Sequence, residues 1–284
     1  MIPRLNIAIP ETMDGALEIL KTQNSLPLCG GTDLVVLLRS RRIAADDFVC
    51  IDRIPELKAI EDMGDSIFVG AACTFSEIEK NELIRNTAPL LASAAGMVAS
   101  PPIRNRATIG GNVQNASPAG DGLVALYGEK AVVVIESHCG SRVVPVRDFV
   151  IQPGKTKLKK EELIKGFTIP KKSNVYNRFF KVGRRNALAI SVVNGCVSAT
   201  CEEGVLSNIE VVLGAVGPKP ICITELNEQI GGKCYTAEID EMVQAIVERS
   251  ISPIDDVRAS SEYRRYIAGI SVRRALREAA GGRR

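Results

Sequence analysis

The first fifty residues alternate between short apolar runs and apolar positions at helical spacing. Apolar residues lie on one side of a predicted helix in "DGALEILKTQ" (14–23). Short strands are predicted at "LPLC" (26–29) and "DDFVCIDR" (46–53), and a helix begins in "TDLVVLLRS" (32–40) between them. This alternation predicts a fold that mixes helices and strands.

The alternation continues to about residue 100 and then stops. A strand is predicted at "SIFVGAA" (66–72) and a helix at "APLLASAAGMVAS" (88–100). Over "SPPIRNRATIGGNVQNASPAGDG" (100–122), proline, glycine and asparagine interrupt every regular pattern. We therefore expect this stretch to be irregular.

Longer elements are predicted in the last part of the chain. The stretches "NVYNRFFKVG" (174–183) and 187–217 predict several longer strands, with "EEG" (202–204) as a hairpin turn. Two helical stretches follow, at 238–250 and 260–280. The change of pattern predicts a domain boundary at about Ser173.

Composition and charge narrow the possible partners. The chain has 284 residues, 45% of them hydrophobic and 24% charged, as in an ordinary folded protein. The net charge is +3 and no long basic block is rich in aromatic residues, so we expect no nucleic-acid partner. No apolar run reaches the roughly 18 residues that span a bilayer, and "MIPRLNIAIP" has no signal-peptide core, so we expect no membrane partner and a soluble, cytoplasmic protein.

Cysteine and histidine give little sign of a metal site. The eight cysteines include no CxxC pair, so we expect neither zinc nor an iron–sulfur cluster in this chain. Most lie in apolar stretches, which predicts reduced, buried thiols. The single histidine, His138, is predicted in a surface turn.

The adjacent glycines Gly30 and Gly31, between a strand and a helix, suggest an anion site. Glycine allows backbone angles closed to other residues and exposes N–H groups, and Thr32 or Asp33 can cap the helix that begins at Leu34. If the Asp33 carboxylate turns back to the helix, consecutive free N–H groups with about half a unit of positive charge remain for a ligand. A tight turn with a capped helix is the alternative.

A second glycine pair strengthens the ligand interpretation. "ATIGGNVQN" (107–115) repeats the strand-like lead, two glycines and polar residues, and two such pairs suit a ligand with two phosphates. The usual nucleotide motifs are missing, since there is no GxGxxG and Phe149 stands where a P-loop needs glycine. A dinucleotide held by an uncommon fold is what remains.

Five motifs together resemble the FAD-binding (medium) subunits of the molybdenum hydroxylase family. They are "GGTDL", "PPIRNRATIGGN", "SPAGDG", "EELIKGFTIP" and "FKVGRRNALAISV", and they look most similar to bacterial xanthine dehydrogenase FAD subunits. The resemblance implies an α+β fold. A two-lobed FAD-binding domain of the vanillyl-alcohol-oxidase (PCMH) type would span residues 1–172, with lobes at about 1–55 and 56–172. A C-terminal α+β domain with an antiparallel sheet and helices would span 173–284.

The resemblance also implies where FAD is held. The Gly30–Gly31 stretch would follow the pyrophosphate, the Gly110–Gly111 stretch would make a second contact, and Asp121 would hydrogen-bond the cofactor. The predicted cofactor-binding residues are Leu28, Cys29, Gly30, Gly31, Thr32, Asp33, Leu34, Thr108, Ile109, Gly110, Gly111, Asn112, Asn115, Asp121, Ile164 and Lys181.

The last two of these residues, Ile164 and Lys181, would lie near the flavin ring system. A lysine there can stabilise the anionic reduced flavin by its charge, although a solvated strand lysine is the alternative for Lys181. The stretch after Lys181 is one residue shorter than in animal xanthine dehydrogenases, which leaves the roles of Arg184 and Arg185 open.

The resemblance implies an electron-transfer function with no catalytic side chain and no metal ligand in this chain. FAD would be non-covalent, while molybdopterin and [2Fe–2S] clusters would lie only on partners, a molybdopterin large subunit and an iron–sulfur small subunit. Electrons would pass from the clusters through FAD to NAD⁺. A stand-alone flavin oxidase, a scaffold without flavin, and an FAD subunit of a nicotinate, aldehyde or carbon monoxide dehydrogenase are the alternatives.

Overall fold

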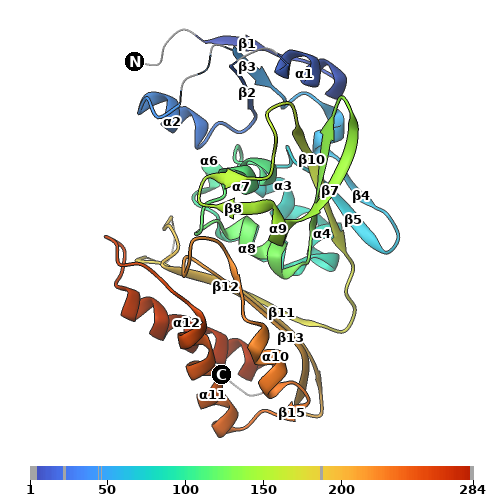
Figure 1. Cartoon of the computed structure of the whole chain (residues 1–284). Coiled ribbons are helices and arrows are strands. Elements are labelled where there is room, and N and C mark those ends of the chain that lie inside the picture. Colours follow the sequence, from blue (N-terminus) through green and yellow to red (C-terminus); the bar gives the residue numbers. More distant parts are fainter. Residues whose placement is uncertain (1–4, 22–23, 44, 46, 186–187, 282–284) are drawn as a thin grey trace.

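The computed structural model describes residues 5–21, 24–43, 45, 47–185 and 188–281. Three parts lie one after another along the molecule, from a small N-terminal lobe to a C-terminal sheet backed by helices (Figure 1). Residues 22 and 23, at the end of the helix predicted at 14–23, lie outside the described residues. So do the first residues of the domain predicted at 1–172 and the last residues of the domain predicted at 173–284. The predicted α+β fold is confirmed, with two lobes followed by an antiparallel sheet and helices. The division after residue 172 remains our proposal.

The first lobe is a three-stranded parallel sheet in the order β1-β3-β2. One helix, α1, is amphipathic: it buries four residues against the core, and the Thr12 side chain caps its N-terminus by accepting from the Gly15 N–H. The elements are β1 (Asn6–Ala8), α1 (Met13–Leu20), β2 (Ser25–Leu28), α2 (Leu34–Arg39) and β3 (Asp47–Cys50).

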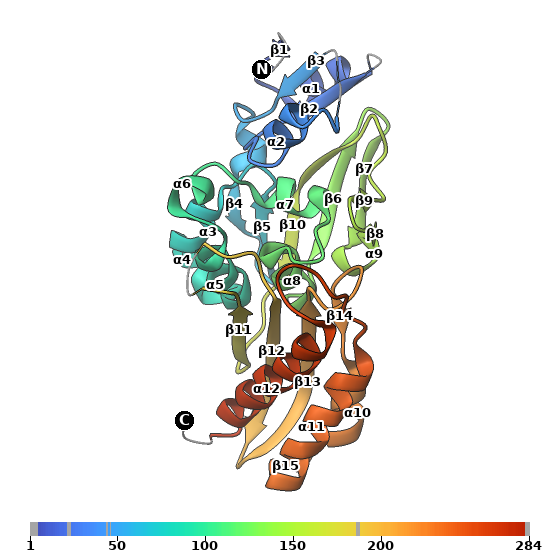
Figure 2. The ribbon, with the colours of Figure 1, turned by 90° about the vertical axis from the view of Figure 1, so that its left-hand side faces the viewer.

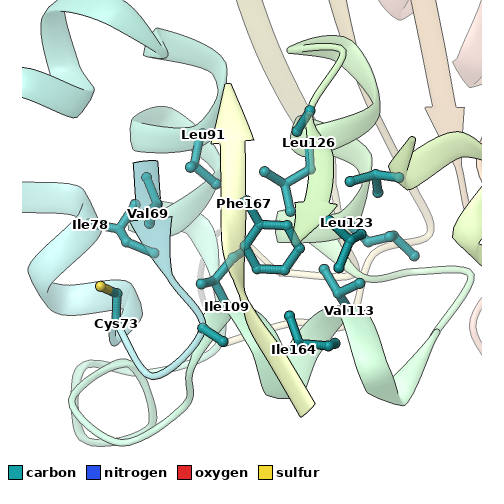
Figure 3. Close-up of a cluster of buried hydrophobic side chains, with 14 of the residues drawn as sticks. Val69, Cys73, Ile78, Leu91, Ile109, Val113, Leu123, Leu126, Ile164 and Phe167 are labelled. Carbon is teal, nitrogen blue, oxygen red and sulfur yellow. The ribbon is translucent and has the colours of Figure 1, made fainter. Parts of the chain in front are cut away.

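The second lobe is a five-stranded sheet, β4-β5-β10-β6-β7, with short helices on one face. Phe167 of β10 lies between the apolar residues of these helices and of β5, as Figure 3 shows. The elements are η1 (Pro55–Lys58), β4 (Ile60–Asp62), β5 (Ser66–Gly70), α3 (Phe75–Lys80), α4 (Glu82–Thr87), α5 (Pro89–Met97), α6 (Pro101–Arg104), α7 (Ile109–Asn115), α8 (Asp121–Gly128), β6 (Val132–Ser137), β7 (Gly140–Pro145), α9 (Val146–Phe149), β8 (Val150–Gln152), β9 (Lys155–Thr156) and β10 (Leu163–Pro170).

The third part is an antiparallel sheet, β11-β12-β13-β14, with β15 paired to β13 and with α10, α11 and α12 together on one face (Figure 2). Its other face meets α8, where Gly128 packs against Cys196 of β12. The elements are β11 (Tyr176–Val182), β12 (Val193–Glu202), β13 (Val205–Gly214), β14 (Ile221–Cys222), α10 (Thr224–Ile230), β15 (Lys233–Cys234), α11 (Ala237–Ser250) and α12 (Ser261–Ala279).

Several local predictions are confirmed. The β12–β13 hairpin turns at Glu203 and Gly204, both with positive φ, as the "EEG" signal predicts. The two C-terminal helices form where their apolar spacing places them. His138 lies in the turn between β6 and β7.

Two predictions are wrong. Residues 100–122 are not irregular: α6, α7 and the start of α8 form there, because Thr108 caps α7 and tertiary packing overrides the weak helix propensity of its glycines. Most cysteines are not buried either, since only Cys73 and Cys196 are, although all eight are free thiols. Across the described residues, every helix is too short or too polar to cross a membrane.

Candidate functional site

The loop between β2 and α2 presents a row of unused backbone donors. Leu28 ends β2, Leu34 begins α2, and Gly31 between them has φ +73°, in the left-handed region that glycine favours. No acceptor within the described residues bonds the N–H groups of residues 30–33. Consecutive free N–H groups of this kind form an anion-binding concavity.

Asp33 does not take up these donors. It is the N-cap of α2, but its side chain makes no capping hydrogen bond, so the predicted capping role of the Asp33 carboxylate is wrong. Asp33 as a residue is exposed to solvent, but its carboxyl group is partly screened from water by its surroundings. This desolvation raises the pKa of Asp33 above the ordinary value. The N–H groups are therefore left for a ligand, with the acidic group beside them.

Gly30 is required by the protein's own packing. A Cβ at Gly30 would lie 2.9 Å from the carbonyl carbon of Arg106 and 3.2 Å from the Cα of Ala107, and closer still to the carbonyl oxygen. The first loop is thus pressed against the residues just before Thr108. Two stretches far apart in the sequence form one site because no side chain separates them.

Cys29 and Thr108 complete this contact. The Thr108 side chain lies beside the Cys29 thiol, and burial together with the nearby Asp52 charge raises the thiol pKa to about 11. Cys29 is therefore a protonated, unreactive thiol at neutral pH. Its place is structural, at the junction of the two loops.

The second glycine pair lies in the first turn of α7, and its donors are occupied. The N–H of Ile109 donates to the Cys73 carbonyl at 3.0 Å, and that of Gly110 donates to the Ala71 carbonyl at 2.9 Å. The N–H of Gly111 donates to the Thr108 hydroxyl at 3.2 Å. The prediction of a second row of free N–H groups is therefore wrong for this pair.

Gly110 and Gly111 have different reasons to lack a side chain. A Cβ at Gly110 would lie 2.7 Å from both the Cβ and the carbonyl oxygen of Ala71, so the fold requires glycine there. At Gly111, which is exposed, an added Cβ would meet only the Thr108 hydroxyl, at 3.1 Å. Among these glycines, Gly111 is open to a ligand.

Asn112 and Asn115 hold the connection from α7 to α8. The side-chain oxygen of Asn112 accepts from the Leu123 N–H at 3.0 Å, and Asn115 is the last residue of α7. Ala116 follows in the left-handed conformation, with φ 48°. This turn places Asp121 at the first position of α8.

Asp121 and Lys181 form a buried ion pair across the two domains. The Lys181 Nζ lies 2.6 Å from Oδ2 of Asp121 and also donates to the Met97 carbonyl at 2.8 Å. The two side chains are 6% and 12% exposed, so solvent screens the pair little. The ammonium is thus neutralised by a carboxylate, which changes the predicted electrostatic role of Lys181.

Ser191 and Asn194 are polar partners that the sequence pattern did not reveal. Their side chains donate to Oδ1 of Asp121 at 2.8 and 2.6 Å. Both lie in the otherwise apolar "AISVVNGCV", and buried polar residues in such a run are the signal that could have found them.

The remaining predicted residues are placed as follows. Ile164 lies on β10 at a β-bulge, 6% exposed and within the core beside Ile109 and Val113 (Figure 3). Arg184 and Arg185 donate to the carbonyls of Val257 and Leu188. Within the part of the chain that is described, no cluster of histidine, cysteine and carboxylate could hold a metal ion.

Two family models match consecutive parts of the chain. The model described as "FAD binding domain in molybdopterin dehydrogenase" matches residues 3–172, and that described as "CO dehydrogenase flavoprotein C-terminal domain" matches residues 178–279. The first match carries the β2–α2 loop, α7 and Asp121. The second carries Lys181, Ser191 and Asn194.

Similar proteins cover nearly the whole chain. The nicotinate dehydrogenase FAD-subunit of Eubacterium barkeri is 31% identical and covers 90% of this chain and 89% of its own. The xanthine dehydrogenase FAD-binding subunit of Escherichia coli O157:H7 is 29% identical, with 90% of both chains covered. A solved structure of carbon monoxide dehydrogenase from Hydrogenophaga pseudoflava superposes with a TM-score of 0.93 at 26% identity, over 99% of this chain and 98% of that one.

Proposed function

The chain belongs to the FAD-binding medium subunits of the molybdenum hydroxylase family, and on that premise we propose that it passes electrons from an iron–sulfur partner to a soluble acceptor. It is an oxidoreductase subunit with an FAD-binding domain. Bound FAD supplies the redox chemistry, while the protein supplies binding, orientation and charge. The described residues fit this division, since the site is built from backbone donors and an ion pair.

The observation that carries the proposal is the row of free N–H groups at residues 30–33. A pyrophosphate needs several donors, and these groups are fixed by the packing of Gly30 on Arg106. We propose that the β2–α2 loop holds the pyrophosphate and that Gly111 and Asn112 face the cofactor beside it. Ile164, Lys181 and Asp121 would lie towards the flavin ring system.

We propose that the acceptor is NAD⁺ and that the partners are an iron–sulfur small subunit and a molybdopterin large subunit. In support, the chain has no cluster of metal-binding side chains among the described residues. Its relatives are named for nicotinate and xanthine, and its structural neighbour for carbon monoxide. Because these substrates differ while the medium subunits share one fold, we propose that the large partner selects the substrate.

The cofactor itself is the first test. Heat or acid release from the purified full chain, followed by chromatography, should yield one FAD per chain. Flavin that stays with the acid precipitate would favour a covalent flavin oxidase, and a colourless protein that binds no added FAD would favour a scaffold. With the partners restored, substrate-dependent reduction of NAD⁺ should appear; reduction of a dye but never of NAD⁺ would refute the acceptor.

A matched pair of glycine variants tests the site. Gly111→Val adds a side chain towards the proposed ligand, and Gly15→Val adds one at the equivalent position of α1. Each glycine donates its N–H to the hydroxyl of a capping threonine, and each added Cβ would lie 3.1 Å from that hydroxyl. We expect Gly111→Val to lose FAD binding and Gly15→Val to keep it; equal FAD content in the two would show that Gly111 does not face the cofactor.

A further inference from the structure

Three side chains from the C-terminal domain converge on the single carboxylate of Asp121. Lys181 of β11 bonds Oδ2, while Ser191 and Asn194 both bond Oδ1. We propose, on the basis of the proposed function, that Ser191 and Asn194 are positioning residues of the flavin site. They act through Asp121 and decide how much of the Lys181 charge is neutralised.

Because Ser191, Asn194 and Asp121 are buried, each of these side chains depends on the others for its hydrogen bonds. Ser191 is 1% exposed and Asn194 is 0% exposed, and Asp121 is 6% exposed. Burying a carboxylate costs free energy unless donors satisfy its oxygens. With Oδ1 held by two neutral donors, Oδ2 is the oxygen left for the ammonium, so the position of Lys181 follows from Ser191 and Asn194.

In the part of the chain that is described, the side-chain amide of Asn194 acts as a hydrogen-bond donor and not as an acceptor. Its Nδ2 donates to Asp121, but its Oδ1 is buried and has no partner among the described residues. An unsatisfied buried acceptor costs stability, which an apolar residue would avoid. The Asn194 side chain is thus used as a donor, to Asp121 at 2.6 Å and to the Ala119 carbonyl at 3.4 Å, while its oxygen goes unpaired.

The backbone that carries these donors is fixed from the other side. The buried Arg264, 1% exposed, donates to the carbonyls of Val192 and Ala215 at 2.5 and 3.1 Å. Its guanidinium is paired with Asp256 at 2.8 Å. Because Ala215 in turn donates its N–H to the Pro118 carbonyl at 2.7 Å, the ends of β12 and β13 are tied to the loop before Asp121.

The sign of the effect follows from the charges. Ser191 and Asn194 hold the Asp121 carboxylate in place against the Lys181 ammonium, so losing either donor lets the carboxylate move away from Lys181. The Lys181 ammonium is then less neutralised, and the potential near the flavin becomes more positive. Electrons are held more tightly there, so the flavin midpoint potential should rise.

Full-length Ser191→Ala and Asn194→Ala, loaded with FAD, test the proposal against Ser198→Ala. Ser198 is a buried serine of the same strand β12, and its hydroxyl has no partner among the described residues. In both variants we expect a higher midpoint potential of the flavin and an FAD Kd raised about tenfold. The loss of one hydrogen bond to a charged group costs about the free energy that corresponds to a tenfold change in Kd. Ser191→Thr, which keeps the hydroxyl, should restore both values.

The outcomes separate this proposal from the one it rests on. If both variants lose thermal stability but keep the potential and Kd of Ser198→Ala, the contacts are only structural and the inference is refuted. If Ser191→Thr behaves like Ser191→Ala, the hydroxyl is not the acting group. A wild-type chain that binds no FAD would instead overturn the proposed function.

Discussion

Replacing Gly30 with alanine should loosen the contact between the first lobe and the rest of the FAD-binding part. The added Cβ would lie 2.9 Å from the carbonyl carbon of Arg106 and 3.2 Å from the Cα of Ala107, whereas relaxed carbon contacts are about 3.5–4.0 Å. Both neighbours are backbone atoms, so no rotamer change relieves the overlap. The β2–α2 loop must move away from α6 and α7.

The loss in free energy of unfolding can be estimated from overpacked cores in other proteins. Forced backbone shifts of this kind cost about 1–3 kcal/mol. For a chain of this size each kcal/mol lowers Tm by about 2–4 °C, so a 2 kcal/mol cost gives a fall of about 4–8 °C. Because the free N–H groups of residues 30–33 move with the loop, FAD binding should weaken as well.

Thermal unfolding of the flavin-free chain by circular dichroism, with Gly111→Ala as control, measures this directly. The control adds the same atom, but it meets only the flexible hydroxyl of Thr108 at 3.1 Å, and alanine favours a helix over glycine by about 1 kcal/mol. Its Tm should therefore stay close to that of the wild type. A Gly30→Ala variant as stable as Gly111→Ala would refute the packing role of Gly30.

Three further outcomes follow from buried titratable groups. Burial raises the pKa of Glu129 to about 7, against the opposing charge of Lys172. The folded state therefore holds this proton more tightly than the unfolded state, so stability should fall as pH rises from about 5 to 7 in urea titrations, and Glu129→Gln should flatten that fall. Burial would raise the pKa of Asp240, but Arg273 and its other donors outweigh it and lower the pKa, so stability from this carboxylate is present at neutral pH and lost in acid. Asp240→Asn should lower the free energy of unfolding, measured in urea, by about 2 kcal/mol at pH 7 and should not lower it once the wild-type carboxyl is protonated. This value is smaller than the usual cost of breaking a buried ion pair because Arg273 is partly exposed. Iodoacetamide at pH 8 should label the exposed Cys201 before Cys29, whose thiol pKa is raised to about 11, and mass spectrometry showing the reverse order would contradict that burial.

The helices, hairpin and family membership could be predicted from local patterns. Apolar spacing predicts α11 and α12, and a pair of turn residues predicts the β12–β13 hairpin, because these elements depend on neighbours within a few positions. The five motifs were sufficient to identify the family, which the family models confirm.

What the sequence pattern could not decide is which polar groups are already used within the fold. Both glycine pairs predict free N–H groups, yet those of Ile109 and Gly110 are taken by the carbonyls of Cys73 and Ala71, which β5 and the start of α3 bring to α7. Gly30 itself is needed for a backbone contact that no local pattern encodes.

The partners of Asp121 show the same limit most clearly. Lys181, Ser191 and Asn194 lie 60, 70 and 73 positions away along the chain. A sequence motif can place a carboxylate and a lysine in one site, but it does not show that they neutralise each other. That depends on how β11 and β12 pack onto α8, because a charge pair is set by distance in space and by exclusion of water, and the tertiary structure alone decides both.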